Sequence, residues 1–255
     1  MFNFKDTFQK ASDNLGFIGV CLGVFAGLFL IAFLFERIFM KQRRRFSDTR
    51  YITYTAVFSA MAGMLMLLEI PLFFAPSFYK LDLSELPVMI CTFYLGPVAG
   101  VLCELFKVAL KVLIKGSPTF FVGDFANFAV GCAFVLPASM IYHLKPGKKT
   151  ALWGLIGGTL FMTVFGSAFN ALYLIPKFAK IYADYGGLDA IIGMGTAVNK
   201  HITSVWTLVF YAVVPFNLVK GVIISVLTFL LYKRISPLMH KMDARRVERK
   251  KKTEE

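Results

Sequence analysis

Val214-Pro-Phe-Asn-Leu-Val-Lys-Gly221 places an amide and an amine inside an apolar stretch, 211–232, that is long enough to cross a membrane. A lysine near the centre of a bilayer costs about 2.5–3.5 kcal/mol on insertion scales, so its side chain normally faces protein or a water-filled cavity. Asn217 and Lys220 are three residues apart and share one face of a helix. Pro215 favours a kink whose freed carbonyls a cavity could use. The residues alone leave two interpretations open: a polar ligand site, or a lysine that reaches the membrane surface beside an asparagine that joins two helices.

The composition is that of a helical integral membrane protein. The chain has 255 residues, of which 57% are hydrophobic and 17% charged, and its mean hydropathy is +0.66. These values favour membrane-spanning helices over a soluble domain. The formal net charge of +13 comes largely from two clusters, Lys41 to Arg50 and Lys233 to Lys252. Beside apolar spans such clusters indicate cytoplasmic ends and contacts with anionic membrane lipids, so binding of nucleic acid is not expected.

Motifs for enzymatic chemistry are absent from the sequence. Pro146-Gly-Lys-Lys-Thr150 lacks the spacing of an ATP-binding P-loop, and neither Gly-x-Ser-x-Gly nor His-Glu-x-x-His occurs. The four cysteines lie in apolar segments without Cys-x-x-Cys spacing and the three histidines are scattered, so neither a metal site nor a cofactor is expected. A membrane chain with a polar cavity and no ATPase motif indicates a binding subunit that depends on partners for energy, not an enzyme.

The first two spans are predicted at residues 16–35 and 51–68. The first is followed by Glu36, Arg37 and a basic cluster instead of a small-residue cleavage site, which favours a retained helix over a signal peptide. The basic flank places residues 37–50 in the cytoplasm and the N-terminus outside. On the second span, Ala56 and Ala60 give a small-residue surface for another helix, although packing within one chain is the commoner use of such a surface.

Residues 86–114 are ambiguous, because one helix of this length would measure about 43 Å and exceed a membrane core of about 30 Å. A single crossing would also place the basic segment 143–149 and the basic C-terminal tail outside, against the positive-inside rule. We therefore predict a hairpin of two short legs that turns at Gly96-Pro97. The second leg carries a polar stripe that has to face a cavity or pair internally. The members of this stripe are Glu104, Lys107 and Lys111.

The remaining segments alternate across the membrane. Residues 116–123 form an external turn, and Asp124 either caps the next helix or contacts a ligand, two roles that the sequence leaves equally open. The connection 176–204 is external and long enough for a short interfacial helix around residues 188–197. The spans that flank these connections are 124–142, 152–175 and 205–232.

The connection Glu69 to Ser84, called the first loop below, combines two prolines, four aromatic residues and the charged pair Lys80 and Asp82. An aromatic-rich surface loop is able to close over a flat ligand. An aromatic belt at the membrane interface is the alternative interpretation.

Four segments together resemble the riboflavin-specific S components of energy-coupling factor (ECF) transporters. They are Phe73 to Pro87, Leu95-Gly-Pro-Val-Ala-Gly100, Asn127-Phe-Ala-Val-Gly131 and Val214 to Gly221. The resemblance covers about residues 50–235; Pro-Phe-Asn-x-x-Lys-Gly is its most specific part, and Leu-Gly-Pro-x-x-Gly is shared more widely among S components. It implies an all-α integral membrane protein with three parts. These are an extra N-terminal transmembrane helix with a basic cytoplasmic linker (1–49), a six-helix S-component core that binds the substrate (50–235) and a basic cytoplasmic tail (236–255).

The same resemblance implies a multi-pass subunit of the cell membrane that captures riboflavin at an extracytoplasmic site beneath the first loop. Its implied partners are a transmembrane coupling protein and two cytoplasmic ATPases. Both ends of the six-helix core then lie in the cytoplasm, in agreement with the positive-inside rule applied to the basic segments. Two alternatives remain: an S component for a different vitamin, and a membrane-embedded enzyme that uses Glu104 as acid or base.

The resemblance also implies roles for particular residues. Those that bond the polar edge of the flavin ring are Asn217, Lys220 and Asn170. The residues of the first loop that close over the ligand are Lys80, Leu81 and Asp82. Leu81 contributes through its backbone and packing. The weaker candidates are Glu104 and Asn127. The expected apolar walls are Phe73, Phe74 and Tyr173. The residues that match a small-residue motif used against the coupling protein are Ala56 and Ala60.

Overall fold

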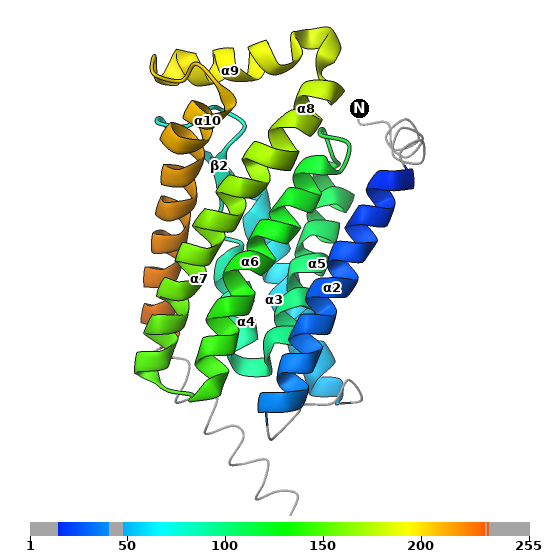
Figure 1. The fold of residues 1–255 in the computed structure, drawn as a ribbon. Helices are drawn as coiled ribbons and strands as arrows, with labels where there is room; N and C mark the ends of the chain where they lie inside the picture. Colours follow the sequence, from blue (N-terminus) through cyan, green and yellow to red (C-terminus); the bar gives the residue numbers. More distant parts are fainter. Residues whose placement is uncertain (1–14, 41–47, 233, 235–255) are drawn as a thin grey trace, which may run out of the picture.

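The computed structural model describes residues 15–40, 48–232 and 234. Its helices stand side by side in a bundle whose long axis is vertical in Figure 1. The long helices are α2 (Leu15–Phe39), α3 (Thr49–Leu67), α5 (Pro97–Lys115), α6 (Val122–Leu144), α7 (Lys148–Phe169) and a last helix, Val205–Tyr232. The shorter elements are β1 (Ile70–Pro71), β2 (Lys80–Leu81), α4 (Glu85–Leu95), η1 (Asn170–Leu174), α8 (Ile175–Ile181), η2 (Ala183–Tyr185) and α9 (Gly187–Val198). The last helix opens with α10 (Val205–Leu208) and η3 (Val209–Val213).

Helix length and composition agree with the predicted all-α membrane protein. Four helices of the described residues are long and apolar enough to cross a membrane: Gly16–Phe39, Val122–Leu144, Lys148–Ile181 and Val205–Tyr232. α3 and α5 have 19 residues each, which gives about 28 Å at ~1.5 Å per residue, close to the thickness of a bilayer core. α5 is less apolar than those four helices because it carries the predicted polar stripe. The three members of the stripe are all buried inside the protein.

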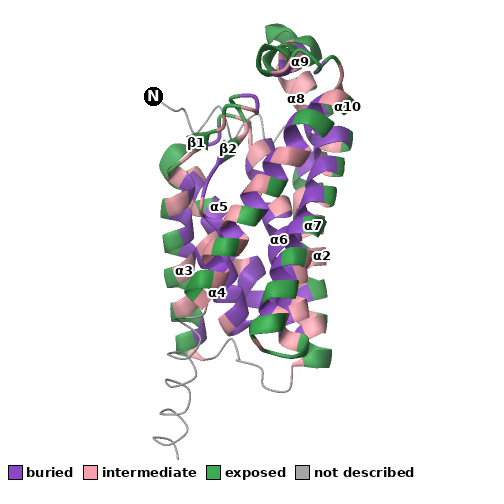
Figure 2. Cartoon of the chain, turned by 90° about the vertical axis from the view of Figure 1, so that its left-hand side faces the viewer, coloured by how far each residue is buried: buried purple, intermediate pink, exposed green. Residues whose placement is uncertain are grey.

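α4 and α5 form the predicted hairpin. The chain turns at Gly96, whose φ is 113°, and Pro97 is the first residue of α5. The two legs are antiparallel, since Lys107 Nζ on α5 donates to Glu85 Oε1 at the start of α4 over 2.9 Å. With 11 residues, α4 is only about 16 Å long and covers half the depth of the bundle. In Figure 2 the chain accordingly runs from β2 down into the bundle before α4 begins.

Successive helices from α2 to α7, the short α4 included, run in opposite directions along the bundle, as predicted for segments that alternate across a membrane. The Gly96 turn, the C-terminus of α2 and the connection between α6 and α7 lie at the lower end of Figure 1. Arg37, Lys145 and Lys148 are therefore at one end of the bundle, and the first loop and α9 are at the other. The basic residues 41–47 and the proposed tail 236–255 lie outside the described residues.

The additional helix α2 is packed along α5 and α6 (Figure 1). The ring of Phe17 meets that of Phe125 edge to face at 5.9 Å between centroids. Near the other end, Glu36 Oε1 accepts a hydrogen bond of 2.8 Å from the backbone N–H of Val98. Because Val98 lies in the first turn of α5, the carboxylate also meets the positive end of that helix. Gly96 is needed beside it, since a Cβ atom there would lie 2.5 Å from Glu36 Oε1.

Two helices contain a five-residue π-turn just before a proline. η1 continues directly into α8, whose second residue is Pro176, and η3 is followed by Val214 and Pro215. A proline donates no backbone hydrogen bond and clashes with the preceding turn, and a widened turn relieves this strain. The outward span therefore continues to Ile181, beyond the predicted end at Ile175.

α9 lies across the upper end of the bundle in Figure 1 and confirms the short helix predicted around residues 188–197. Gly186 and Gly187 precede it with φ of 90° and 52°, which turn the chain sharply after η2. Its inner side packs closely, because a Cβ atom at Gly195 would lie 2.7 Å from Ile202. α9 thereby forms a cover over the upper part of the bundle.

The small residues of α3 divide between two faces. Ala62 and Gly63 are buried, and a Cβ atom at Gly63 would lie 3.1 Å from Leu110 of α5. Ala56 and Ala60 are exposed on the outward side of α3, which is the exposed side of that helix in Figure 2. Packing within the chain therefore uses the first pair and leaves the second pair open.

Candidate functional site

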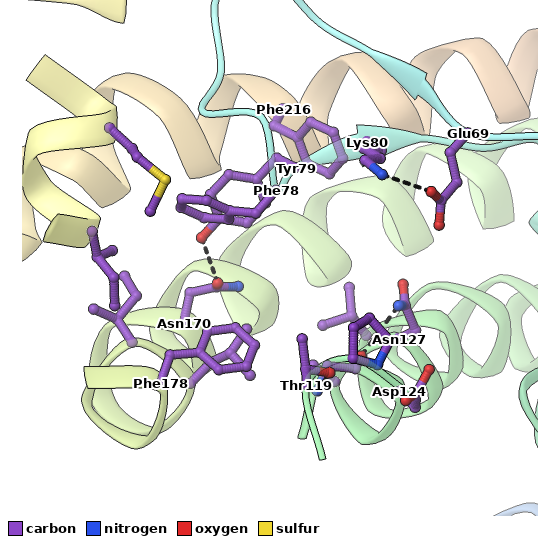
Figure 3. A pocket seen from close by; sticks show the side chains of 18 of the residues that line it. Glu69, Phe78, Tyr79, Lys80, Thr119, Asp124, Asn127, Asn170, Phe178 and Phe216 are labelled. Atoms are coloured by element: carbon purple, nitrogen blue, oxygen red, sulfur yellow. Dashed lines mark hydrogen bonds and ion pairs between the residues drawn. The ribbon is translucent and has the colours of Figure 1, made fainter. Parts of the chain in front are cut away.

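A cavity of about 480 Å³ lies at the end of the bundle that carries the first loop and α9. It is lined by the first loop, the start of α6, the middle of the last helix, the η1 to α8 region and α9. Its size lies within the range of about 300–1,000 Å³ that is usual for small-molecule sites. Figure 3 shows side chains from all these parts of the chain around one space.

Aromatic side chains form much of the cavity wall: Phe78, Tyr79, Phe178, Tyr182, Tyr185 and Phe216. The rings of Tyr79 and Phe216 are 5.4 Å apart. The predicted apolar walls were wrong in detail. Phe73 is 92% exposed and packs on Phe74 at the tip of the first loop, and Tyr173 stacks on Phe169 outside the cavity.

Asn170 joins α7 to the first loop. Its Oδ1 accepts a hydrogen bond of 2.7 Å from the hydroxyl of Tyr79, and its Nδ2 donates to the carbonyl of Gly166 over 2.7 Å. Burial raises the pKa of Tyr79, so the phenol remains a donor. Tyr79 was not among the predicted site residues, although it lies next to Lys80 in a loop rich in aromatic residues. Both ends of the Asn170 amide are occupied, and the residue holds the loop against the cavity.

Asn217 presents an unsatisfied amide to the cavity. The side chain lines the cavity and is 4% exposed. Its Nδ2 has no hydrogen-bond partner among the described residues. Gly166 leaves room for it, because a Cβ atom there would lie 3.0 Å from Nδ2. A buried donor without a partner costs about 1–3 kcal/mol, and a ligand that offers an acceptor would recover this energy.

Lys220 lies one helical turn from Asn217 and is 7% exposed. Its Nζ is 3.0 Å from Asp82 Oδ2 in the first loop and 3.6 Å from Glu85 Oε1 at the start of α4. The partners of Lys220 thus come from segments far from it in the sequence. The contact with Glu85 is too long for a hydrogen bond, and an ammonium group has three donors, so at least one remains for the cavity that Lys220 lines.

Lys220 belongs to a charged network beneath the cavity. Lys107 Nζ is 2.9 Å from Glu85 Oε1 and 2.6 Å from Glu104 Oε2. The network contains three carboxylates and two amines from three segments of the chain, namely Asp82, Glu85, Glu104, Lys107 and Lys220. Breaking such a buried pair from one side typically costs about 3–5 kcal/mol. Glu85 was missed by the sequence analysis, in which the predicted hairpin began at residue 86.

Glu104 does not line the cavity but lies in the interior beside Lys107. Gly131 of α6 provides its space, since a Cβ atom there would lie 2.4 Å from Glu104 Oε2. Leu81 is also buried without lining the cavity, and pairs with Ile70 between β1 and β2. Neither side chain touches the cavity, so a contact with a bound molecule would have to be indirect or, for Leu81, through the backbone.

Lys80 and Asp82 do line the cavity. Lys80 Nζ is 2.8 Å from Glu69 Oε2, and the same oxygen is 2.6 Å from Lys115 Nζ at the end of α5. Asp82 Oδ1 accepts a hydrogen bond of 2.9 Å from the backbone N–H of Ser84. The first loop is thus tied at its outer part by Glu69 and at its inner part by Lys220.

Asp124 and Asn127 line the cavity from the first turns of α6. The helix begins after Phe121, and Asp124 caps no backbone group; its Oδ1 instead lies 2.6 Å from Lys111 Nζ. The structural alternative proposed for Asp124, a helix cap, was therefore wrong. Asn127 Nδ2 donates to the carbonyl of Gly123 over 3.1 Å. Lys111 lines the cavity as well, so the polar stripe of α5 divides between the charged network and the cavity.

No group of three or more histidine, cysteine, aspartate and glutamate side chains in residues 15–40, 48–232 and 234 is arranged to hold a metal ion. The polar groups around the cavity are amides, hydroxyls and paired charges. Such groups fix the orientation of an organic ligand by hydrogen bonds.

Comparisons with known proteins agree with a transporter subunit. Residues 50–232 match the family model "ECF transporter, substrate-specific component". The chain is 33% identical over 210 residues to "Riboflavin transporter RibU" of Staphylococcus aureus (strain TCH60), covering 80% of this chain and 100% of the relative. It is 28% identical over 187 residues to "Riboflavin transporter FmnP" of Bacillus subtilis (strain 168), covering 73% and 92%. These relatives are named as transporters, not enzymes.

A solved structure gives the same result for the fold. The structure described as "Structure and mechanism of the S component of a bacterial ECF transporter" superposes with a TM-score of 0.58 at 31% sequence identity. The superposition covers 76% of this chain and 99% of that chain. The chain therefore belongs to the family of substrate-specific (S) components of ECF transporters.

Proposed function

We propose that the chain is the riboflavin-binding subunit of an ECF-type importer and that the cavity at the outer end is its vitamin site. The observation that carries this proposal is the buried, unpartnered amide of Asn217 in the wall of an aromatic-lined cavity. Riboflavin is the transported ligand named for the relatives above. Its ring system is flat and apolar at one end and carries imide donors and acceptors at the other.

The polar edge of the flavin ring matches Asn217 and Lys220. An asparagine amide offers one donor group and one acceptor, which complement an adjacent carbonyl and imide N–H. The free donor of Lys220 reaches a second carbonyl. The faces of the ring pack against aromatic side chains such as Tyr79, Phe178 and Phe216. Asn170 contributes by holding Tyr79 in the cavity wall. Glu104 contributes indirectly, because it pairs with Lys107, which in turn pairs with Glu85 beneath the cavity.

The first loop is the movable part of this site. Lys80, Leu81 and Asp82 close it over the vitamin, with Leu81 acting through its backbone and packing. This is supported by the ion pairs that fasten the loop to the helices at two points, Glu69 to Lys115 and Asp82 to Lys220. Loops that close over ligands commonly move on a microsecond to millisecond timescale.

The site faces the outside of the cell, with the N-terminus outside and the C-terminus in the cytoplasm. This orientation is supported by the positive-inside rule, since the end of the bundle opposite the cavity carries Arg37, Lys145 and Lys148. The same basic end contacts anionic lipids. Residues 50–235 act as the vitamin-binding core, residues 1–49 as an additional helix with its linker, and residues 236–255 as a cytoplasmic tail.

Energy comes from a transmembrane coupling protein and two cytoplasmic ATPases, which act on the loaded subunit and reorient it in the membrane. The coupling protein docks on the outward face of α3. This is supported by the exposure of Ala56 and Ala60, which allow another helix to approach closely.

The test is a titration of the detergent-purified protein with riboflavin, followed by quenching of flavin fluorescence. Saturable quenching is expected. The absence of quenching, together with purified protein that carries no flavin, would overturn the proposal. Competition by a panel of other vitamins separates riboflavin from a different substrate, and product analysis in the absence of ATPases separates binding from enzymatic conversion.

A further inference from the structure

Besides Asn170, Asn217 and Lys220, a second group of polar side chains lines one side of the cavity. The residues that form it are Lys111, Thr119, Asp124 and Asn127, called the polar wall below. They come from the end of α5, the turn 116–121 and the start of α6. In Figure 3, Thr119, Asp124 and Asn127 lie together at one side of the cavity, away from Asn170 and Phe178.

The centre of the polar wall is a buried ion pair. Lys111 Nζ and Asp124 Oδ1 are 2.6 Å apart, and the two residues are 8% and 3% exposed. Ser117 donates a hydrogen bond to the second carboxylate oxygen. The pair is therefore fixed in position and has no net charge. A carboxylate accepts about four hydrogen bonds and an ammonium group donates three, so both members retain capacity for a molecule in the cavity that they line.

The other two members add groups of both kinds. Asn127 uses its Nδ2 on the carbonyl of Gly123, which leaves its carbonyl oxygen as an acceptor. Thr119 Oγ1 accepts from the N–H of Gly123 over 3.1 Å, which leaves its hydroxyl proton to donate. Asp124 and Asn127 are three residues apart on α6 and share one face of that helix.

We propose that the polar wall is the subsite for the polyhydroxylated chain of the vitamin. This inference rests on the proposed function, since it assigns a second part of the same ligand. Each hydroxyl group of a polyol both donates and accepts, and the wall offers donors and acceptors side by side. Because the ion pair is neutral, it favours uncharged hydroxyl groups.

A role in stability alone is the competing explanation, because the ion pair also joins α5 to α6. The two explanations differ in what they predict for ligands of different length. If the ion pair only joins the two helices, its substitution changes the affinity for every flavin alike. If the polar wall binds the polyol, substitution lowers the affinity only for flavins that carry the polyol.

The experiment compares riboflavin with lumiflavin, which has a methyl group in place of the polyol chain. Both flavins are titrated by fluorescence quenching into the full-length chain and into three variants: Asp124→Asn, Asn127→Ala and the double variant Lys111→Met with Asp124→Asn. The double variant removes both charges and avoids an unpaired buried lysine. Asp189→Asn, a matched change at an exposed position of α9 that does not line the cavity, is the control.

In the variants of the polar wall, the Kd of riboflavin is expected to rise about tenfold or more, while that of lumiflavin changes less than about twofold. The control is expected to leave both values unchanged. An equal loss for both flavins, or no loss for riboflavin, would overturn the inference but leave the proposed function intact. If the unaltered chain bound neither flavin, the proposed function itself would be wrong and the inference would end with it.

Discussion

Lys220 in the last helix and Asp82 in the first loop are 138 residues apart in the sequence, yet their side chains meet at 3.0 Å inside the bundle. One amine thus contacts the cavity, the loop that covers it and, through Glu85, the start of α4. A molecule that bonds Lys220 adds a partner to a group that already holds the loop. If Lys220 binds the vitamin as proposed, we expect binding and closure of the first loop to be coupled through this residue.

The first prediction concerns this connection. Asp82→Asn preserves the shape of the side chain but removes the charge that faces Lys220. The first loop is expected to open more readily, so that riboflavin dissociates faster and affinity falls by about 1–3 kcal/mol. Stopped-flow fluorescence measures the dissociation rate. An unchanged rate would contradict the coupling, and Asp189→Asn on the surface of α9 serves as the control.

The second prediction separates affinity from stability at Asn217. Asn217→Ala removes the proposed contact with the flavin ring, and the binding free energy is expected to weaken by about 1–3 kcal/mol. The unloaded protein should be no less stable, because the variant also removes a buried donor that has no partner. Titration with riboflavin and thermal unfolding without it test the two halves. Full affinity in the variant would exclude Asn217 from the site.

The third prediction concerns the charged network. Lys107→Met leaves Glu85 and Glu104 buried beside each other without their shared cation. The free energy of unfolding is expected to fall by about 3–5 kcal/mol. Adding Glu104→Gln to the variant should recover part of this loss, because one unpaired charge is removed. Thermal unfolding in detergent gives the comparison, and a double variant as unstable as Lys107→Met would argue against the pairing.

The fourth prediction is a pH dependence that arises at Glu69, outside the spans. Burial acts to raise the pKa of this carboxyl, but hydrogen bonds from Lys115 and Lys80 outweigh it and place the pKa below the ordinary value of 4.5. A carboxyl whose pKa is lowered in the closed state stabilises that state above its ordinary pKa. The stabilisation is lost as the pH falls through the lowered value.

Riboflavin should accordingly dissociate more slowly from the unaltered chain than from Glu69→Gln at neutral pH. This difference is expected to disappear as the pH falls below about 4.5. The ratio of the two dissociation rates is the quantity to measure, because other acidic groups titrate in the same range and affect both proteins. A ratio that stays constant from neutral pH to about pH 3 would contradict a role for Glu69 in closure.

The fifth prediction concerns the docking of α2. Glu36→Ala removes the carboxylate that accepts from the backbone N–H of Val98 at the start of α5. A loss of about 0.5–2 kcal/mol in stability is expected, as for other helix caps. Riboflavin affinity should not change, because this contact lies at the opposite end of the bundle from the cavity. Thermal unfolding and titration of the same sample test both statements.

The path of the chain could be predicted from the sequence to a large extent. The excess length of residues 86–114 and the positive-inside rule predicted the hairpin, and Gly96-Pro97 gave its turn. The length of the connection 176–204 predicted the short helix α9. The widened turn at η1 was not foreseen. It depends on how the helix accommodates Pro176, and the sequence analysis treated a proline only as a kink.

The site was less accessible to sequence analysis. Asn217 stands out in the sequence because an amide is rare in an apolar segment. The contacts across the cavity cannot be read from the sequence, because Tyr79 and Asn170 are 91 residues apart and Lys220 and Asp82 are 138 residues apart. Phe73 and Phe74 looked equivalent to Phe78 and Tyr79 in the sequence. Tyr79 is distinguished by its contacts with Asn170 and Phe216, which are distant in the sequence.

The half-length of α4 has a consequence for how the protein enters the membrane during synthesis. Eleven residues are too few to partition into lipid as an independent span, which needs about 20. The polar backbone just before α4 would also be unprotected in hydrocarbon. We therefore expect α4 to be inserted together with α5, as a helical pair in which Glu85 and Lys107 neutralise each other.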